Sequence, residues 1–246
     1  MTRPGPRVAH EALPRTTTTR RPRRALLTGG RPLAQAILRR RFNLEIHGAE
    51  HFPEHGPVVV AANHIGFLDG PLMAIMSPRP VHALTKREMF KGAMGPFLSA
   101  TGQIPVWRNA PDPAAIRTTL RVLRDGGAVG VFPEGTRGAG ELASIEGGAA
   151  YFAMVTGATV VPLAMLGTRD PGGSLNSVPK AGTRMVMTFG APVSFDWHAW
   201  PRRTADVRAA AQDIRTAILQ TLRDAEATTG ISLPGPVPPT LEKESL

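Results

Sequence analysis

The stretch PVVVAANHIGFLDGPLMAIM, residues 57–76, joins a strand to a helix through a short polar loop. Its first part, residues 57–62, is a β-branched run that follows a Gly-Pro step, which is typical of a buried strand. Residues 69–76 read as a helix. Strand-like and helix-like segments keep alternating along the chain, so we predict an α/β fold: a single domain with a largely parallel central sheet flanked by helices.

The same alternation continues after this stretch. Strands are expected at 81–85, 128–132, 158–165 and 183–190, and helices at 112–127, 148–157 and 204–228. The clearest helix has Asp112 as its N-cap and Pro113 at its first position, and paired glycines end it. Because chemistry on parallel sheets collects where strands end, we expect a site in the loops that follow 57–62 and 128–132.

The net charge of +10 lies in the first part of the chain. Residues 1–41 carry eleven arginines and one acidic residue, whereas residues 42–246 contain equal numbers of basic and acidic side chains. A nucleic-acid-binding domain more typically has a basic face within its fold, so this distribution argues against nucleic acid as a partner. Residues 1–24, rich in Pro, Arg and Thr, are expected to form a disordered basic arm. The arm is either solvated or attracted to an anionic membrane surface.

A short amphipathic helix with a basic end is predicted at 31–41. Leu33, Ile37 and Leu38 share one face, and three arginines follow them. The helix could pack on the domain, lie on a membrane surface, or do both. Residues 231–246 are expected to be a flexible tail. The sequence has no run of eighteen apolar residues and no apolar signal-peptide region, so we expect a cytoplasmic location.

His64 and Asp69 are five positions apart in the loop after residues 57–62. An imidazole can remove a proton from a hydroxyl group near neutral pH when a carboxylate holds its other nitrogen. A strand-to-helix turn eased by Gly66 would allow that contact. The spacing also fits a structural helix cap beside a hydrogen-bonded histidine, so the residues alone leave both interpretations open.

Other kinds of site agree less well with the sequence. Cysteine is absent, which excludes thiolate nucleophiles, disulfides and cysteine-ligated zinc. His47, His51 and His55 recur at intervals of four, but Gly and Pro interrupt the helix that would align them, so we expect no metal. The chain has no G-x-S-x-G elbow and no Walker-type loop, and the dinucleotide-like GAGELA (138–143) lacks a ribose-binding acid after it. A base without a protein nucleophile remains, so a substrate hydroxyl would attack directly.

Three ordered motifs resemble those of the glycerolipid acyltransferase family, which contains bacterial 1-acylglycerol-3-phosphate acyltransferases. The first, N-H-x-x-x-x-D, is matched by Asn63, His64 and Asp69. The second, of the type G-x-I-P-V-x-R, is matched by Gly102, Ile104, Pro105, Val106 and Arg108. The third, F-P-E-G-T-R, is matched by Phe132, Pro133, Glu134, Gly135, Thr136 and Arg137. A strand-borne V-P motif looks like Val161-Pro162. The similarity covers residues 42–195 and implies the fold of that family, in an acyltransferase domain at 25–230.

The resemblance implies an O-acyltransferase that moves a fatty acyl group from acyl-CoA or acyl carrier protein to the hydroxyl of a lysophospholipid. Its foremost implied reaction converts 1-acylglycerol-3-phosphate to phosphatidic acid, with His64 as general base and Asp69 orienting the ring. The acceptor's phosphate would be bound by Arg108, Glu134, Gly135, Thr136 and Arg137. Glu134 would also fix one of the arginines by an ion pair. No metal or other cofactor is implied, and the enzyme would be peripheral on the inner face of the cell membrane.

One departure from the family pattern concerns the acceptor. After the third motif the family commonly has Phe-Lys-x-Gly, whereas this chain has IEGG at 145–148, with Glu146 in place of the lysine. An anion there holds a phosphate less strongly, so the alternative is a related acyltransferase for a different lipid or alcohol. Position 66 is Gly where the family often has Ser, and this difference affects the strand-to-helix turn after His64. The arginine-rich arm suggests an alternative from a different class, a non-catalytic protein that binds anionic lipid or nucleic acid.

Overall fold

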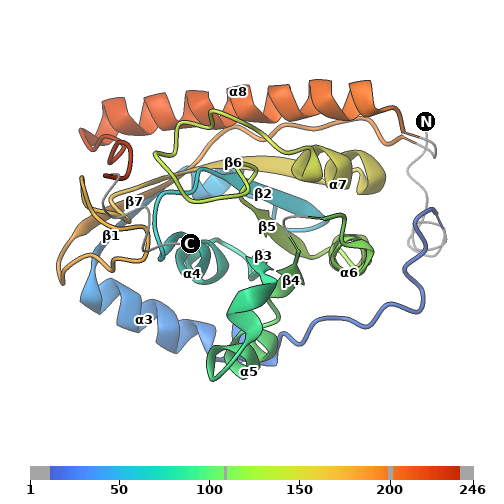
Figure 1. Ribbon diagram of the computed structural model, residues 1–246, viewed down its shortest axis with the longest axis horizontal. Coiled ribbons are helices and arrows are strands. Elements are labelled where there is room, and N and C mark those ends of the chain that lie inside the picture. Colours follow the sequence, from blue (N-terminus) through green and yellow to red (C-terminus); the bar gives the residue numbers. More distant parts are fainter. Residues whose placement is uncertain (1–11, 108–109, 199–201, 239–246) are drawn as a thin grey trace.

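The computed structural model describes residues 12–107, 110–198 and 202–238. Within them, seven strands form one sheet in the order β1-β7-β6-β2-β5-β3-β4 (Figure 1). Neighbouring strands pair in parallel except β6 and β7, which are antiparallel. The strands are β1 (Asn43–His47), β2 (Val58–Ala62), β3 (Val81–Lys86), β4 (Ile104–Val106), β5 (Ala128–Val131), β6 (Thr159–Leu166) and β7 (Arg184–Phe189). The predicted single α/β domain with a largely parallel sheet is therefore confirmed.

Helices cover both faces of this sheet. They are α2 (Ala25–Gly29), α3 (Arg31–Arg41), α4 (Asp69–Met76), α5 (Met94–Ala100), α6 (Pro113–Arg124), α7 (Gly148–Thr156) and α8 (Thr204–Thr229), with 3-10 turns η1 (Ala49–His51) and η2 (Arg87–Phe90). In Figure 1, α8 runs along the upper side of the molecule, and α3 and α5 lie on the lower side. Helix α6 begins as the sequence predicts, because the Asp112 carboxylate accepts hydrogen bonds from the backbone N–H groups of Ala114 and Ala115.

Two apolar clusters hold the layers together. Helices α6, α7 and α8 pack on one face of the sheet, where Leu123 and Ile214 belong to the same apolar cluster as Val59 of β2. Helix α4 packs on the other face, where Leu72 belongs to the same apolar cluster as Val60. Successive side chains of β2 therefore enter opposite clusters, which is why this strand is apolar at every position instead of alternating.

Residues 12–24 are not disordered, although their composition predicts an arm without structure. Thr16 is fully buried, and the Arg124 guanidinium of α6 donates to the carbonyl oxygen of Pro14 at 2.7 Å. Arg21 forms an ion pair with Asp125 at 2.6 Å. Polar contacts rather than apolar side chains hold this stretch on the domain, so hydrophobic patterning could not reveal it. Residues 1–11 of the expected arm lie outside the described residues.

Residues 231–238 also differ from the expected flexible tail. Ile231 and Leu233 pack against the apolar cluster under α8, and the backbone N–H of Leu233 donates to the Glu226 carboxylate at 2.9 Å. The carbonyl oxygen of Gly235 accepts a hydrogen bond of 2.6 Å from Arg169. The segment is irregular, as its prolines predict, yet it is fixed to the domain. Residues 239–246 lie outside the described part of the chain.

The predicted amphipathic helix is α3. Leu38 packs against the core, whereas Leu33 and Ile37 are 69% and 58% exposed. The helix therefore contacts the domain and also presents apolar side chains to solvent. Among the described residues, no helix is both long and apolar enough to cross a bilayer.

Candidate active site

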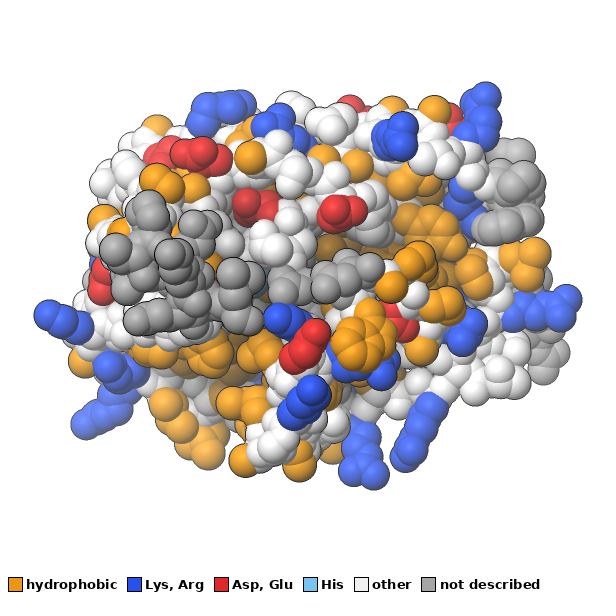
Figure 2. Space-filling view, in the orientation of Figure 1, with side chains coloured by type: hydrophobic (Ala, Val, Ile, Leu, Met, Phe, Trp, Pro, Cys, Tyr) orange, Lys and Arg blue, Asp and Glu red, His pale blue; other side chains and the backbone are white. Residues whose placement is uncertain are grey.

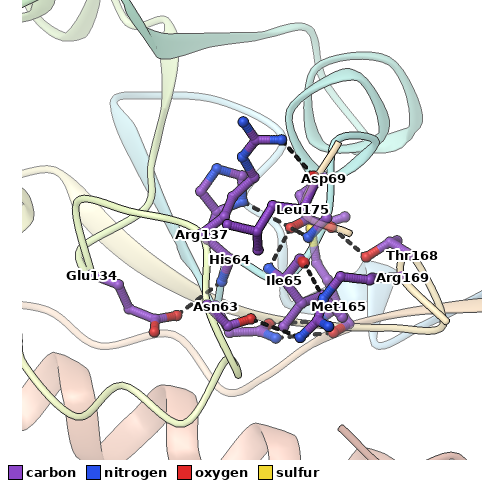
Figure 3. Close-up of polar contacts among 12 residues, drawn as sticks. Asn63, His64, Ile65, Asp69, Glu134, Arg137, Met165, Thr168, Arg169 and Leu175 are labelled. Atoms are coloured by element: carbon purple, nitrogen blue, oxygen red, sulfur yellow. Dashed lines mark hydrogen bonds and ion pairs between the residues drawn. The ribbon is translucent and has the colours of Figure 1, made fainter. Parts of the chain in front are cut away.

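The site lies where β2, β5 and β6 end side by side. Ala61 of β2 pairs with Val131 at the end of β5, and Ala62 pairs with Leu163 of β6. The loops that follow these three strands carry the polar residues drawn in Figure 3. Chemistry was expected at this edge because loops after parallel strands converge there.

His64 and Asp69 are in direct contact, as the general-base interpretation of their spacing requires. His64 Nδ1 lies 2.8 Å from Asp69 Oδ2 (Figure 3). Asp69 begins α4 and is completely buried, whereas the His64 side chain is partly exposed. Because Nδ1 donates its proton to the carboxylate, the neutral ring has its lone pair on Nε2. An imidazole held in this way can accept a proton from a substrate hydroxyl.

The Asp69 carboxylate is fully engaged by its surroundings. Besides His64, Oδ2 accepts hydrogen bonds from the backbone N–H groups of Ile65 at 2.7 Å and Gly66 at 2.8 Å. Oδ1 accepts a hydrogen bond of 2.5 Å from the hydroxyl of Thr168. Such bonds offset the hydration that a carboxylate loses when it is buried. Asp69 therefore caps the turn and orients His64, so the two interpretations of the motif are compatible.

Phe132 and Glu134, from the loop after β5, hold His64 on two further sides. The rings of Phe132 and His64 are stacked, with centroids 3.8 Å apart and an interplanar angle of 13°. The Glu134 carboxylate accepts a hydrogen bond of 2.9 Å from the backbone N–H of His64. Burial raises the pKa of Glu134, and its hydrogen bonds with the backbone of His64 and Leu142 oppose that shift. The structure gives Glu134 a bond to the His64 backbone and no ion pair with Arg137; Arg108, the other expected partner, lies outside the described residues.

The remaining residues of the third motif shape the loop around His64. Gly135 has a left-handed conformation with φ of 71°, and Thr136 after it is exposed. The Arg137 guanidinium donates to the carbonyl oxygen of Leu175 at 2.6 Å (Figure 3). The backbone N–H of Gly138 then donates to the carbonyl oxygen of His64 at 2.9 Å. Both main-chain polar groups of His64 are thus bonded to this loop.

Comparisons with known proteins agree with this geometry. An acyltransferase family model matches residues 43–166, about half of the chain, and these include the residues of every predicted motif. The chain belongs to the acyltransferase family. The 1-acyl-sn-glycerol-3-phosphate acyltransferase of Bacillus subtilis (strain 168) is 32% identical over 135 residues, which are 54% of this acyltransferase and 67% of the Bacillus protein.

Two further relatives differ more in length or sequence. The 1-acyl-sn-glycerol-3-phosphate acyltransferase alpha of Ovis aries is 32% identical over 134 residues, 52% of this acyltransferase and 46% of that protein. The acyltransferase therefore spans about half the length of this relative. The crystal structure of the 1-acyl-sn-glycerophosphate (LPA) acyltransferase PlsC from Thermotoga maritima superimposes with a TM-score of 0.63 at 19% identity, covering 82% of this chain and 80% of that one. That likeness shows a shared fold.

Several motif residues of the acyltransferase have structural roles. The Asn63 side chain exchanges hydrogen bonds of 3.0 and 2.8 Å with the backbone of Met165 and so ties β2 to β6. Pro162 is buried in β6 beside Ala61, and the carbonyl oxygen of Pro133 accepts a hydrogen bond from Glu146. These three motif residues shape the backbone around the site.

The second motif contains β4, the last strand in the order of the sheet. Gly102 lies before β4, with φ of 69°, and its carbonyl oxygen accepts a hydrogen bond of 2.7 Å from buried His82. Ile104 and Pro105 belong to β4, where Ile104 is fully buried. The predicted phosphate ligand Arg108 lies outside the described residues.

Glu146, the departure from the family pattern, is close to the predicted phosphate loop. Its side chain is exposed, and its Cγ is 3.8 Å from the position that a Cβ on Gly135 would take. The anion therefore lies beside the loop that was expected to bind the acceptor's phosphate.

Sequence reasoning missed two site residues of the acyltransferase, Thr168 and Arg169. Both follow β6 and both are almost completely buried. A polar pair directly after an apolar strand was the available signal, but it lies beyond the last recognised motif.

Proposed function

We propose that this acyltransferase transfers a fatty acyl group from an acyl thioester to the free hydroxyl of 1-acylglycerol-3-phosphate, giving phosphatidic acid. The observation that carries the proposal is the 2.8 Å contact between His64 and a completely buried Asp69. The names of the Bacillus and Ovis relatives support lysophosphatidate as the acceptor. The donor would be acyl-CoA or acyl carrier protein.

Nε2 of His64 would accept the proton of the acceptor hydroxyl while that oxygen attacks the thioester carbonyl. The negative charge of Asp69 stabilises the imidazolium as it forms. The tetrahedral intermediate then expels the thiolate, which takes the proton from Nε2 and leaves as a thiol. The carbon–oxygen bond that forms replaces the carbon–sulfur bond that breaks, so the step needs neither an acyl-enzyme nor a cofactor.

The acceptor's phosphate would be held by Arg137, Gly135 and Thr136 together with Arg108. The bond from Arg137 to Leu175 orients its guanidinium, whose donor geometry suits phosphate oxygens. The negative charge of Glu146 beside this loop repels a doubly charged phosphate. This repulsion favours an alternative acceptor, a lipid or alcohol with less negative charge, for the same acyl transfer. Thiol release measured against lysophosphatidate and uncharged lysolipids separates these acceptors.

The test of the base is His64→Ala in the purified enzyme. Removal of a general base lowers the rate by about 10²- to 10⁴-fold. His55→Ala is the matched control, because His55 is exposed and outside the site. Equal transfer by His64→Ala and wild type would show that His64 is not the base.

We also propose that the enzyme is peripheral on the inner face of the cell membrane and docks through α2, α3 and α5. Helix α2 contacts both α3 and α5. Exposed apolar side chains on these helices are Leu26, Leu33, Ile37, Met94 and Phe97. Exposed arginines 39–41 end α3. In Figure 2, hydrophobic and basic side chains gather along the lower edge of the molecule, where Figure 1 places α3 and α5. That combination suits an anionic bilayer.

The docking surface is tested with the double variant Leu33→Gln, Ile37→Gln. It is expected to sediment less with vesicles that contain anionic lipid, while transfer to a soluble short-chain acceptor stays near wild type. Leu13→Gln is the control, because Leu13 is similarly exposed but lies beside Arg202, away from these helices. Unchanged sedimentation of the double variant would refute the docking surface.

A further inference from the structure

Two buried polar residues lie beneath the His64–Asp69 pair. β6 ends at Leu166, and the chain turns through Gly167, with φ of 74°, into Thr168 and Arg169. Thr168 is fully buried and Arg169 is 1% exposed. Burial of a hydroxyl and a guanidinium is unfavourable unless their hydrogen bonds are satisfied. The hydrogen-bond partners of Thr168 and Arg169 therefore indicate what these two residues hold in place.

Thr168 holds the oxygen of Asp69 that does not face His64. Its hydroxyl donates to Asp69 Oδ1 at 2.5 Å, whereas the bonds from His64, Ile65 and Gly66 all reach Oδ2. The carboxylate is therefore fixed at both oxygens. A carboxylate bonded at Oδ2 alone could rotate about its Cβ–Cγ bond, and the direction in which it holds the imidazole would change.

The backbone of Thr168 is also pressed against the loop that carries His64. A Cβ on Gly66 would lie 2.5 Å from the carbonyl oxygen of Thr168, closer than real atoms approach. Glycine at position 66 is what permits this contact. Thr168 is thus held in place relative to Asp69 by its hydroxyl, which bonds the carboxylate, and by its backbone, which packs against Gly66.

Arg169 joins three segments that are far apart in the sequence. Nε donates to the carbonyl oxygen of Ile65 at 2.8 Å (Figure 3). Nη2 donates to the carbonyl oxygens of Gly138 at 3.1 Å and Gly235 at 2.6 Å. Nη1 donates to the carbonyl oxygen of Gly173 at 3.1 Å. Burial lowers the pKa of Arg169, and the nearby charge of Asp69 raises it. The guanidinium thus ties the His64 loop to the loop after β5 and to the C-terminal segment.

We propose that Thr168 and Arg169 are positioning residues for acyl transfer: Thr168 fixes the carboxylate that orients His64, and Arg169 fixes the loops that carry His64 and Glu134. The inference rests on the proposed function. Misplacement of a reacting group by a fraction of a bond length lowers the rate strongly, so residues that only hold the base still contribute to catalysis.

The test compares Thr168→Val with Thr168→Ser in the full-length enzyme. Valine keeps the shape and removes the hydroxyl, so we expect kcat to fall about 10- to 100-fold, the value of a hydrogen bond to a charged group, with little change in KM. Serine keeps the hydroxyl and is expected to restore most of kcat. Thr119→Val is the matched control: Thr119 is equally buried, and its hydroxyl has no hydrogen-bond partner among the described residues.

A second readout does not depend on turnover. The proton shared by His64 Nδ1 and Asp69 is expected to give a low-field proton NMR resonance that is absent from His64→Gln. Thr168→Val should shift or broaden this resonance, whereas Thr168→Ser and Thr119→Val should leave it in place.

Wild-type kcat and an unshifted resonance in Thr168→Val would overturn the inference. Equal losses in Thr168→Val and Thr168→Ser would overturn it as well, because they would show that packing and not the hydroxyl matters. Failure of the proposed function has a different signature. In that case His64→Ala retains full acyl transfer, or the wild type transfers none, and the resonance still reports whether Thr168 holds Asp69.

Discussion

Replacement of Asp69 by asparagine separates the charge of this residue from its hydrogen bonds. Three N–H donors, from His64, Ile65 and Gly66, point at Oδ2, and one hydroxyl, from Thr168, points at Oδ1. An asparagine amide fits this surrounding in one orientation. Its oxygen takes the place of Oδ2, and its NH2 group faces the Thr168 hydroxyl, which can turn to accept. The variant is therefore expected to fold.

The magnitude of the rate loss follows from the geometry of the pair. With Nδ1 and Oδ2 2.8 Å apart, the centres of an imidazolium and a carboxylate lie farther apart than the bonded atoms. At a separation of ~4 Å and an effective dielectric constant of ~20, their attraction is about 4 kcal/mol. Loss of that attraction in the transition state corresponds to a decrease of about a thousandfold in kcat.

The assay is initial-rate thiol release with saturating acyl donor and acceptor, together with thermal unfolding of the same samples. Asp69→Asn is expected to unfold within a few degrees of wild type while kcat falls about 10²- to 10³-fold. Asp125→Asn is the matched control, because that carboxylate pairs with Arg21 and Arg121 away from the site. More than a tenth of wild-type kcat in a folded Asp69→Asn enzyme would refute the electrostatic role of Asp69.

Three further predictions concern stability. Gly66→Ala should lower the free energy of unfolding by about 1–3 kcal/mol, because the added Cβ meets the Thr168 carbonyl oxygen. Gly138→Ala is the control and should not lower it, because the space around that Cβ is open. Equal melting temperatures of the two variants would contradict this prediction. Arg169→Met should cost about 3 kcal/mol or more in urea unfolding and speed amide exchange in residues 231–238, since four carbonyl oxygens lose their donor. Because burial raises the pKa of Glu134 above its unfolded value, its contribution to stability is retained at low pH and lost as pH rises through that pKa. Glu134→Gln should flatten this dependence in urea unfolding at several pH values, and an unchanged slope would contradict it.

Much of the architecture could be predicted from local sequence. The β-branched run at 57–62 and the Asp112-Pro113 start of α6 are local signals, and the structure has β2 and α6 there. Strands β1 and β4 were not predicted. β4 has only three residues, including Pro105, so neither length nor alternation marks it.

The site could be predicted only as far as its motifs reach. Spacing placed His64 and Asp69 in one turn, but the role of Glu134 depends on which backbone group it meets, and that is set by the register between β2 and β5. Thr168 lies 99 positions from Asp69, and Arg169 lies 104 positions from Ile65. Contacts of such range follow from packing and have no local pattern. The order in residues 12–24 was missed because polar contacts to distant residues hold that stretch, and residues 231–238 are held by one such bond together with the packing of Ile231 and Leu233.

The bond from Arg169 to Gly235 spans 66 positions and bears on how the protein matures during synthesis. Translation delivers the sheet and the loops that carry His64 and Glu134 first, and Gly235 leaves the ribosome later. A nascent chain that ends before this residue has every motif, yet the loops around His64 still lack one of the hydrogen bonds that hold them. We therefore expect the loop that carries His64 to be held by all of these bonds only after α8 and the segment behind it have emerged.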